Sequence, residues 1–163
     1  MPSLSRVRRH LSFVEVIEGD VDSAKKCHCE RSVMEQLAAS AIPFDAVAIS
    51  SEGCSFIISG RDEARFAAAI RDLNVAAKVH GHCARVVLTR TVIDRPLPPV
   101  RSVMEAFDAA AIGIVHLNSD ASSLTVLVDE RNANRVVEVL SAFYAQPAAR
   151  GVAPNLKSSS SAA

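Results

Sequence analysis

A five-residue motif occurs twice in the chain, and no other feature of the sequence limits the possible folds as strongly. Residues 31–35 read Arg-Ser-Val-Met-Glu, and the same residues return at 101–105. Each copy begins an alanine-rich segment, which ends at Ile42 in the first copy and at Ile112 in the second. A repeat of about 70 residues is longer than one helix or one hairpin, so it predicts two copies of a complete folding unit.

Both copies predict the same order of helices and strands. After an initial helix with one apolar stripe, each copy continues as a β-prone segment, a turn and a second β-prone segment, which predict a hairpin. A polar turn and another apolar stripe then predict a second helix. The predicted hairpin strands are 42–49 and 54–59 in the first copy, and 112–117 and 122–128 in the second. Further strands are predicted at 11–17, 76–80 and 83–91.

This order of elements predicts an α+β fold of two ferredoxin-like units side by side. A βαββαβ unit folds as an antiparallel sheet with two helices on one face. We expect the units at 11–81 and 82–146, an N-terminal arm or strand at 1–10, and a disordered tail at 147–163. A second copy of the chain can cover the sheet edge and apolar surface that such units leave, so we expect a homodimer.

Composition and charge exclude several classes of partner. Of the 163 residues, 18 are basic and 18 acidic, so the chain has no net charge with which to attract a nucleic acid. Hydrophobic residues make up 49%, too many for a disordered chain, yet no apolar run approaches the roughly 20 residues needed to cross a bilayer. We expect the four cysteines to be free thiols and the protein to be cytoplasmic.

We predict no catalytic residue, no metal site and no cofactor. All six glycines stand alone, so no phosphate-binding loop can be assembled from them. Residues 27–29 (Cys-His-Cys) and 80–83 (His-Gly-His-Cys) contain metal-binding side chains. On a helix Cys27 and Cys29 would point about 200° apart, and on a strand His80 and His82 share one face while Cys83 takes the other. We therefore expect that the chain is not an enzyme.

Short segments in both copies carry a resemblance to known domains. In the second copy, residues 82–88, 110–114, 122–129 and 136–140 match an opening strand, a Gly-Ile strand, a serine-pair strand and a final helix. In the first copy the matching segments are 41–45, 50–52 and 54–56. In this order and duplication they resemble the tandem ACT domains of the C-terminal regulatory region of aspartate kinases, over most of 11–144.

The resemblance implies a regulatory module. Such pairs of ACT domains bind a free amino acid, commonly lysine or threonine, at an interface between ACT domains. Binding changes the activity of an attached or associated kinase. By resemblance we expect a non-catalytic module with an amino-acid effector and a kinase or another biosynthetic enzyme as its partner.

The residues of the first copy predict a ligand site for a free amino acid. The loop that enters the first helix can supply N–H donors for the carboxylate, and Asp45 can neutralise the ammonium group. Ser51 and Glu52 can line a side-chain pocket. The predicted ligand-binding residues are Asp20, Val21, Phe44, Asp45, Ser51 and Glu52. Ordinary structural roles stay open for them: a helix cap for Asp20, a turn for Ser51 and Glu52, and a solvated strand position for Asp45.

The chain departs from the family where each first helix begins. The family places Pro-Gly there, whereas this chain has Asp-Val-Asp at 20–22 and Pro-Leu-Pro-Pro at 96–99. A proline lacks the N–H donor that a ligand would need. An alternative function is therefore an ACT-fold interaction protein that has lost its ligand and acts through dimer or partner surfaces. RNA binding through Phe13 and Phe56 is a third class, which the absence of net charge disfavours.

Overall fold

The computed structural model describes residues 6–18, 29–50, 53–73, 75–89 and 97–145. Along these residues the order strand, helix, two strands and helix occurs twice, and a short 3-10 helix precedes the second α-helix each time. The strands are β1 (Arg6–Glu18), β2 (Phe44–Ser50), β3 (Gly53–Ser59), β4 (Val75–Thr89), β5 (Ile114–Ser119) and β6 (Ser123–Asp129). The helices are α1 (Cys29–Ala39), η2 (Gly60–Asp62), α2 (Glu63–Ala69), α4 (Val100–Ala109), η3 (Glu130–Asn132) and α5 (Ala133–Ala145).

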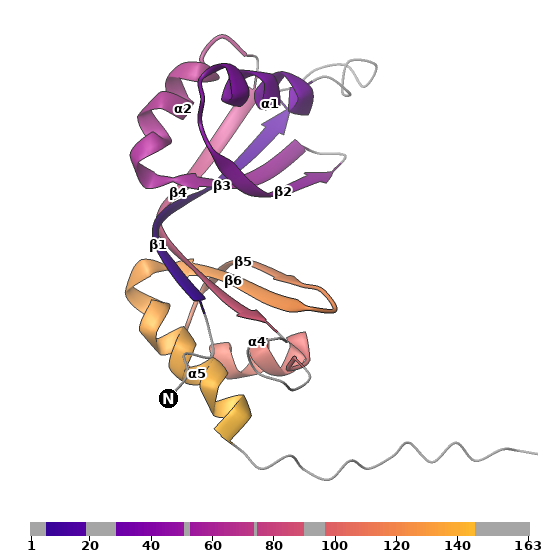
Figure 1. Cartoon of the computed structure of the whole chain (residues 1–163), viewed down its shortest axis with the longest axis vertical. Helices are drawn as coiled ribbons and strands as arrows, with labels where there is room; N and C mark the ends of the chain where they lie inside the picture. The colour runs from indigo at the N-terminus through magenta and orange to yellow at the C-terminus, as the bar shows by residue number, and fades with distance from the viewer. Residues whose placement is uncertain (1–5, 19–28, 51–52, 74, 90–96, 146–163) are drawn as a thin grey trace, which may run out of the picture.

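The strands form one antiparallel sheet in the order β2-β3-β1-β4-β6-β5 (Figure 1). From one edge the order is β2-β3-β1-β4, and from the other it is β5-β6-β4-β1. The same ferredoxin-like pattern is thus present twice, with β1 and β4 shared by both units. We call the part with α1, α2, β2 and β3 the first unit, and the part with α4, α5, β5 and β6 the second unit. The predicted α+β class with two such units is confirmed.

The shared strands β1 and β4 bend where the two units meet. Residues 11–17 of β1 pair with β3 in the first unit, whereas residues 6–8 pair with the later part of β4. The pairing register shifts at the bend, and His10 (φ 57°) and His82 (φ 54°) adopt left-handed backbone conformations there. We expected separate strands at 76–80 and 83–91, and the structure joins them into one strand. The expected ends of the N-terminal arm and of the first unit fall inside β1 and β4, at these bends.

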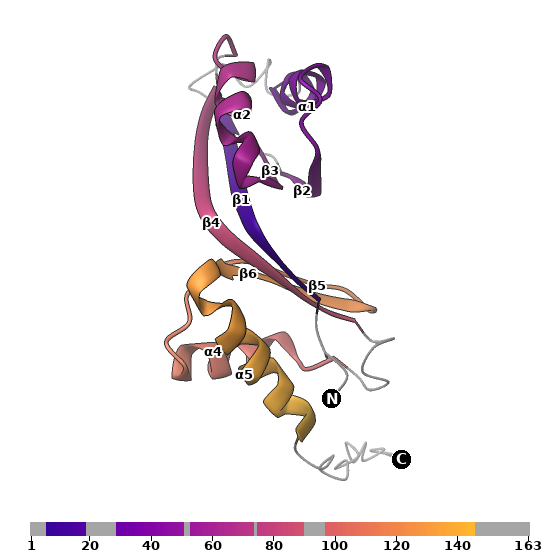
Figure 2. The same cartoon turned by 60° about the vertical axis from the view of Figure 1, so that its left-hand side comes forward.

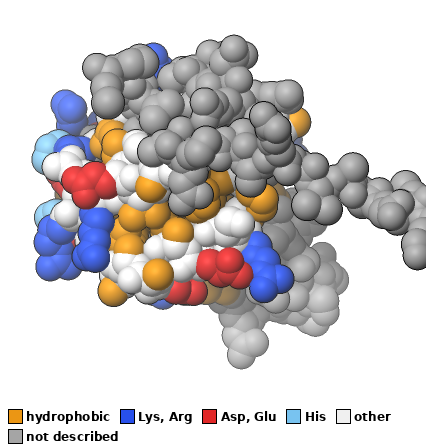
Figure 3. All heavy atoms as spheres, turned by 90° about the horizontal axis from the view of Figure 1, so that it is seen from below, with side chains coloured by type: hydrophobic (Ala, Val, Ile, Leu, Met, Phe, Trp, Pro, Cys, Tyr) orange, Lys and Arg blue, Asp and Glu red, His pale blue; other side chains and the backbone are white. Residues whose placement is uncertain are grey.

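The four described α-helices cover the outer face of the curled sheet (Figures 1 and 2). Each pair of helices buries its own apolar core because valine, leucine and phenylalanine recur on one helix stripe and on alternate strand residues. The core of the first unit includes Val33, Leu37, Phe56, Ile58 and Phe66. The core of the second unit includes Val86, Val103, Phe107, Leu124, Val136 and Leu140. Figure 3 shows the second unit from below, where hydrophobic side chains gather between charged ones.

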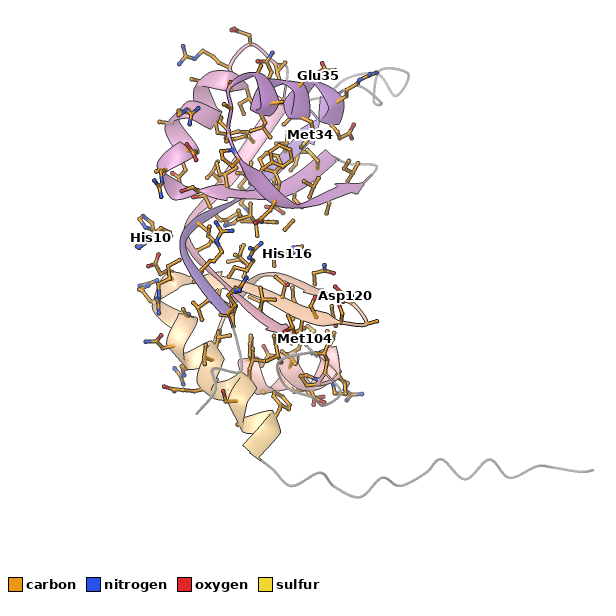
Figure 4. All side chains as sticks on the ribbon, viewed as in Figure 1. His10, Met34, Glu35, Met104, His116 and Asp120 are labelled. Carbon is orange, nitrogen blue, oxygen red and sulfur yellow. The ribbon has the colours of Figure 1, made fainter. Side chains whose placement is uncertain are left out.

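A third apolar cluster packs on the concave face of the sheet, where the two units meet. This cluster contains Leu11, Phe13 and Ile57 from the first unit and Cys83 and Leu127 from the second. The ring of His116, on β5, lies between the two half-sheets and stacks on Phe13 with centroids 5.1 Å apart (Figure 4). The cluster therefore joins the two units directly, in addition to the shared strands.

The duplication extends to the way that the first helix of each unit ends. After α1, the N–H of Ile42 bonds to the carbonyl of Leu37, and Ala41 adopts a left-handed conformation (φ 50°). After α4, the N–H of Ile112 bonds to the carbonyl of Phe107, and Ala111 has φ 52°. This is the Schellman motif, in which glycine is the usual left-handed residue. Both units use alanine instead, and bury the isoleucine that follows.

Some expectations fall on residues outside the described ranges. The tail at 147–163 lies there, as do Cys27 and the entrance to the first helix of the first unit at 20–22. In the second unit Pro99 is the N-cap residue of α4, and a proline has no N–H to donate there. Cys54 and Cys83 are both buried, at 5% and 1% exposure. None of the described helices has the length and hydrophobicity of a membrane span.

Candidate functional site

Two of the six predicted ligand-binding residues begin the edge strand β2, and the other four lie outside the described residues. Phe44 and Asp45 are the first two residues of β2. The residues outside the described ranges are Asp20, Val21, Ser51 and Glu52. Ser50 and Gly53 flank the last two and pair at the far end of β2, roughly 15 Å along the strand from Asp45. Asp45 and Ser50, the residue before Ser51, thus lie at opposite ends of β2.

Strand alternation explains where the side chains of Phe44 and Asp45 go. Phe44 pairs with Ile58 and turns to the helix side, where its ring meets the edge of Phe56 at a centroid distance of 6.1 Å. Asp45 pairs with Ile57, so its carboxylate turns to the concave face of the sheet. The aromatic contact fixes the start of β2, and the next residue directs a carboxylate toward the second unit.

A cavity of about 400 Å³ opens beside Asp45, where the first unit meets the N-terminal part of β1. We call it the junction cavity. Its apolar lining consists of Leu11, Ala41, Pro43, Phe44, Ile57 and Ile58. Its polar lining consists of Arg8, Asp45, Ser59, Arg61, Asp62 and Arg65. An apolar floor with a few charged groups at its rim is typical of a site for a small organic molecule, and the volume is in the usual range.

The carboxylate of Asp45 connects the first unit to the second. Its Oδ1 accepts a hydrogen bond from Nη1 of Arg85 at 2.7 Å, and its Oδ2 accepts one from Nη1 of Arg8 at 3.3 Å. Both arginines lie on the parts of β1 and β4 that pair with each other in the second unit. Arg85 is 16% exposed and Arg8 is 56% exposed, so Arg85 is held by its surroundings while Arg8 remains open to solvent. Asp45 is therefore already neutralised by two cations of the same chain.

The second carboxylate of the junction cavity is also paired. Asp62 is buried and accepts a hydrogen bond from Arg65 at 2.9 Å, three residues further along the chain. The other Nη of Arg65 donates to the carbonyls of Ser40 and Ala41, so Arg65 also ties α2 to the end of α1. Arg61 differs from these side chains because its one described polar contact is a 3.3 Å hydrogen bond from Nε to the hydroxyl of Ser59. Among the described residues, Arg61 makes no ion pair.

Sequence reasoning missed the arginines of the junction cavity. Arg8 precedes Asp45 by 37 positions, and the two meet because β1 runs through both units. Arg61 and Arg65 are spaced as neighbours on one face of a helix turn. The signal that could have found Arg61 is its place directly after the hairpin, where the second copy has Arg131.

A second hollow lies at the other end of β2. Its volume is about 240 Å³, and its lining includes Glu15, Ile17, Ile49, Ser50 and Gly53. Glu15 is the charged group of this hollow, and its Oε2 is 3.3 Å from Nε2 of His80. Of the two cavities beside β2, this one is nearer to the chain positions of Ser51 and Glu52.

A third cavity, of about 650 Å³, lies on the outer side of the bends. Most of its charged groups have hydrogen-bonded or ion-paired partners. Arg131 donates two hydrogen bonds to Asp129, at 2.9 and 2.8 Å, and these bonds lower the pKa of Asp129 to about 2. Arg9 donates to Asn134 at 2.7 Å, and His10 lies 3.3 Å from the carboxylate of Glu130. In the part of the chain that the structure describes, no group of three or more metal-binding side chains is arranged around a common point.

No family model and no curated protein sequence matches this chain. Solved structures do match it. An aspartate kinase from Clostridium acetobutylicum superposes with a TM-score of 0.68 and 13% identity, over 85% of this chain and 34% of that one. The regulatory subunit of aspartate kinase from Thermus thermophilus, in a ligand-free form, superposes with a TM-score of 0.65 and 11% identity, over 85% of this chain and 94% of that subunit.

Another match is E. coli aspartokinase III in complex with lysine and aspartate, with a TM-score of 0.62 and 16% identity, over 85% of this chain and 32% of that one. This chain spans about a third of the two kinases and nearly the whole length of the Thermus subunit. At such low identities the likeness establishes the fold. The chain has the fold of the ACT-like regulatory region of aspartate kinases, as its sequence resemblance implies.

Proposed function

We propose that this chain is a non-catalytic regulatory module that binds a free amino acid between its two ACT-like units and thereby regulates an enzyme. The fold supports a regulatory role, since the chain matches the regulatory subunit of aspartate kinase from Thermus thermophilus over nearly its whole length. The partner that we propose is a kinase of that class or another biosynthetic enzyme. We also propose a cytoplasmic location and a homodimer.

The main observation behind the proposal is that one carboxylate, that of Asp45, both lines the junction cavity and links the two units. Asp45 lines the cavity from the first unit, and it bonds to Arg8 and Arg85 on the second-unit parts of β1 and β4. A ligand ammonium group that bonds to Asp45 must compete with these guanidinium groups. Binding would then change the contacts between the units, which is the differential interaction that allosteric coupling requires.

The ligand class follows from the resemblance and from one matching structure. E. coli aspartokinase III has been crystallised with lysine and aspartate, and the resemblance suggests lysine or threonine. In the junction cavity Asp45 would receive the ammonium group, and the exposed guanidinium groups of Arg8 and Arg61 would receive the carboxylate. Phe44 and the other apolar residues would contact the carbon chain.

A thermal-shift panel of free amino acids tests this proposal. A ligand at about 100 times its dissociation constant adds about 2.7 kcal/mol to the free energy of unfolding. For a chain of this size we expect a rise in Tm of about 6–10 °C. Asp45→Ala should remove the shift.

Ser122→Ala is the matched control, because Ser122 lies in the β5–β6 turn of the second unit, where it donates to Asp120. This variant should retain the full shift. A panel without any shift, or a shift lost in Ser122→Ala and kept in Asp45→Ala, contradicts the proposal.

A second candidate is an interaction protein of the same fold without a ligand. The exposed edge strand β2 favours it, because Phe44, Val47 and Ile49 are 37%, 42% and 66% exposed there. An open edge with apolar side chains is a template for pairing with another chain. Size-exclusion chromatography with light scattering should then show a dimer in the absence of any amino acid, together with a flat thermal-shift panel.

A further inference from the structure

The junction cavity holds more cationic than anionic groups. Asp45 and Asp62 are its two carboxylates. The nearest guanidinium groups are those of Arg85, at 2.7 Å from Asp45, and Arg65, at 2.9 Å from Asp62. These two pairs neutralise both acids. Arg8 shares the carboxylate of Asp45 with Arg85 at the longer distance of 3.3 Å, and Arg61 has no acidic partner among the described residues. Counted with Arg65 and Arg85, the four arginines exceed the two carboxylates by two positive charges.

The second unit shows what a fully paired arginine looks like at the position of Arg61. Arg131 follows the second hairpin as Arg61 follows the first, and Asp129 stands where the first unit has Ser59. Asp129 accepts hydrogen bonds from Nε and Nη2 of Arg131. Because Ser59 offers only a hydroxyl at 3.3 Å, Arg61 keeps its charge available to a ligand.

Arg85 adds to the excess of donors. Its Nη1 is occupied by Asp45, while its Nε is buried and has no hydrogen-bond partner within the described residues. Arg85 is largely shielded from solvent, so it holds Asp45 in place whether or not Arg8 turns away. Arg8 makes a longer hydrogen bond to Asp45 than Arg85 does, and its side chain is more exposed. Arg8 is therefore the arginine that can turn to a ligand.

We propose that the junction cavity selects a small aliphatic ligand with two carboxylates, such as an acidic amino acid or a dicarboxylate, rather than lysine. This inference rests on the proposed function, since it keeps the regulatory site at the junction, and it replaces lysine or threonine by an acidic ligand. One carboxylate would bond to Arg61 and the other to Arg8, and a chain of a few methylene groups would lie on Leu11, Phe44 and Ile57. A cationic side chain would add a third positive charge where two are already in excess, and a neutral one would leave that excess without an anionic partner.

Isothermal titration calorimetry on the full chain at low salt tests the proposal. The probes are L-glutamate, glutarate, L-lysine, L-threonine and inorganic phosphate. We expect L-glutamate or glutarate to bind at least tenfold more tightly than L-lysine, L-threonine and phosphate. L-glutamate and glutarate differ only in the ammonium group, so their ratio shows whether the natural ligand is an amino acid or a plain dicarboxylate.

The matched variants are Arg61→Gln and Arg131→Gln, which remove the same charge at equivalent positions of the two units. Arg61→Gln and Arg8→Gln should each weaken dicarboxylate binding at least tenfold, while Arg131→Gln should leave it unchanged. Arg61 is exposed and makes one weak hydrogen bond, so its variant should retain the wild-type Tm.

Three results would overturn the inference: binding of L-lysine, L-threonine or phosphate as tight as that of the dicarboxylates, no binding of either dicarboxylate, or equal weakening by Arg61→Gln and Arg131→Gln. Binding of lysine or threonine that Asp45→Ala removes would refute the acidic ligand and leave the proposed function standing. Binding of glutarate without any amino acid would support the acidic site and contradict an amino-acid effector.

Discussion

Phe13→Ala is expected to lower the free energy of unfolding by about 3–4 kcal/mol and to separate the unfolding of the two units. Phe13 is 4% exposed at the centre of the cluster on the concave face, and its ring stacks on His116 of the second unit. Its removal leaves a cavity between Ile57 and Leu127, which belong to different units. Packing across the junction would then be lost while each helix-covered core stays intact.

Urea unfolding, followed by circular dichroism and by hydrogen exchange of the two hairpins, measures this effect. Phe66→Ala is the control, since Phe66 is 1% exposed in the core of the first unit alone. It should cost a similar free energy and preferentially destabilise the first unit. A loss below about 1 kcal/mol for Phe13→Ala, with one shared transition, would show that the cluster does not join the units.

Gly53→Ala is expected to cost about 2–3 kcal/mol and to loosen the β2–β3 hairpin. Gly53 has φ +150°, and a Cβ added there would stand 2.0 Å from the carbonyl oxygen of Val16. That oxygen belongs to the backbone of β1 and cannot turn away. Because Gly53 pairs with both Ile17 and Ser50, the strain would reach both neighbouring strands.

Gly113→Ala is the matched control for this second prediction. Apart from the two residues adjacent in the chain, no described residue has an atom within 4 Å of a Cβ at Gly113, which follows α4 in the second unit. The change should be neutral or stabilise by about 0.5 kcal/mol, since it reduces the freedom of the unfolded chain. Thermal unfolding of both variants measures the difference. Equal Tm values for the two variants would contradict the close packing of Gly53 against β1.

The duplicated architecture could be predicted from the sequence because both units repeat local signals. The motif at 31–35 and 101–105 opens each first helix, and apolar periodicity identifies the hairpins and second helices that follow. Ile42 and Ile112, where both alanine-rich segments end, close the same helix-terminating motif in each unit. Such local patterns fix element type and order without knowledge of the tertiary contacts.

The sharing of strands between the units could not be predicted in this way. β4 was expected as two strands, at 76–80 and 83–91, with Gly81 and His82 between them. In the structure Gly81 and His82 continue the strand, since its partner β1 bends with it at His10. Pairing between residues 6–8 and 85–87 is a long-range contact for which no local pattern exists.

Only part of the candidate site could be predicted, because long-range contacts bring its residues together. Phe44 and Asp45 were identified from a resemblance that concerns only their own segment of the chain. The partners of Asp45, which are Arg8 and Arg85, come from two other strands and depend on the bend of the sheet. The surplus charge of Arg61 becomes visible only when its contacts are compared with those of Arg131.

Two-dimensional amide NMR of the full chain, titrated with the panel of free amino acids and dicarboxylates, tests most directly whether a ligand binds between the two units. We expect saturable shifts at Arg8, Asp45, Ile57 and Arg61, and further shifts at Arg85 as the link between the units changes. Val103 and Leu140, in the core of the second unit, should not move. If no compound shifts any resonance at millimolar concentration, or if the shifts gather around α4 and α5, a regulatory site at the junction is contradicted.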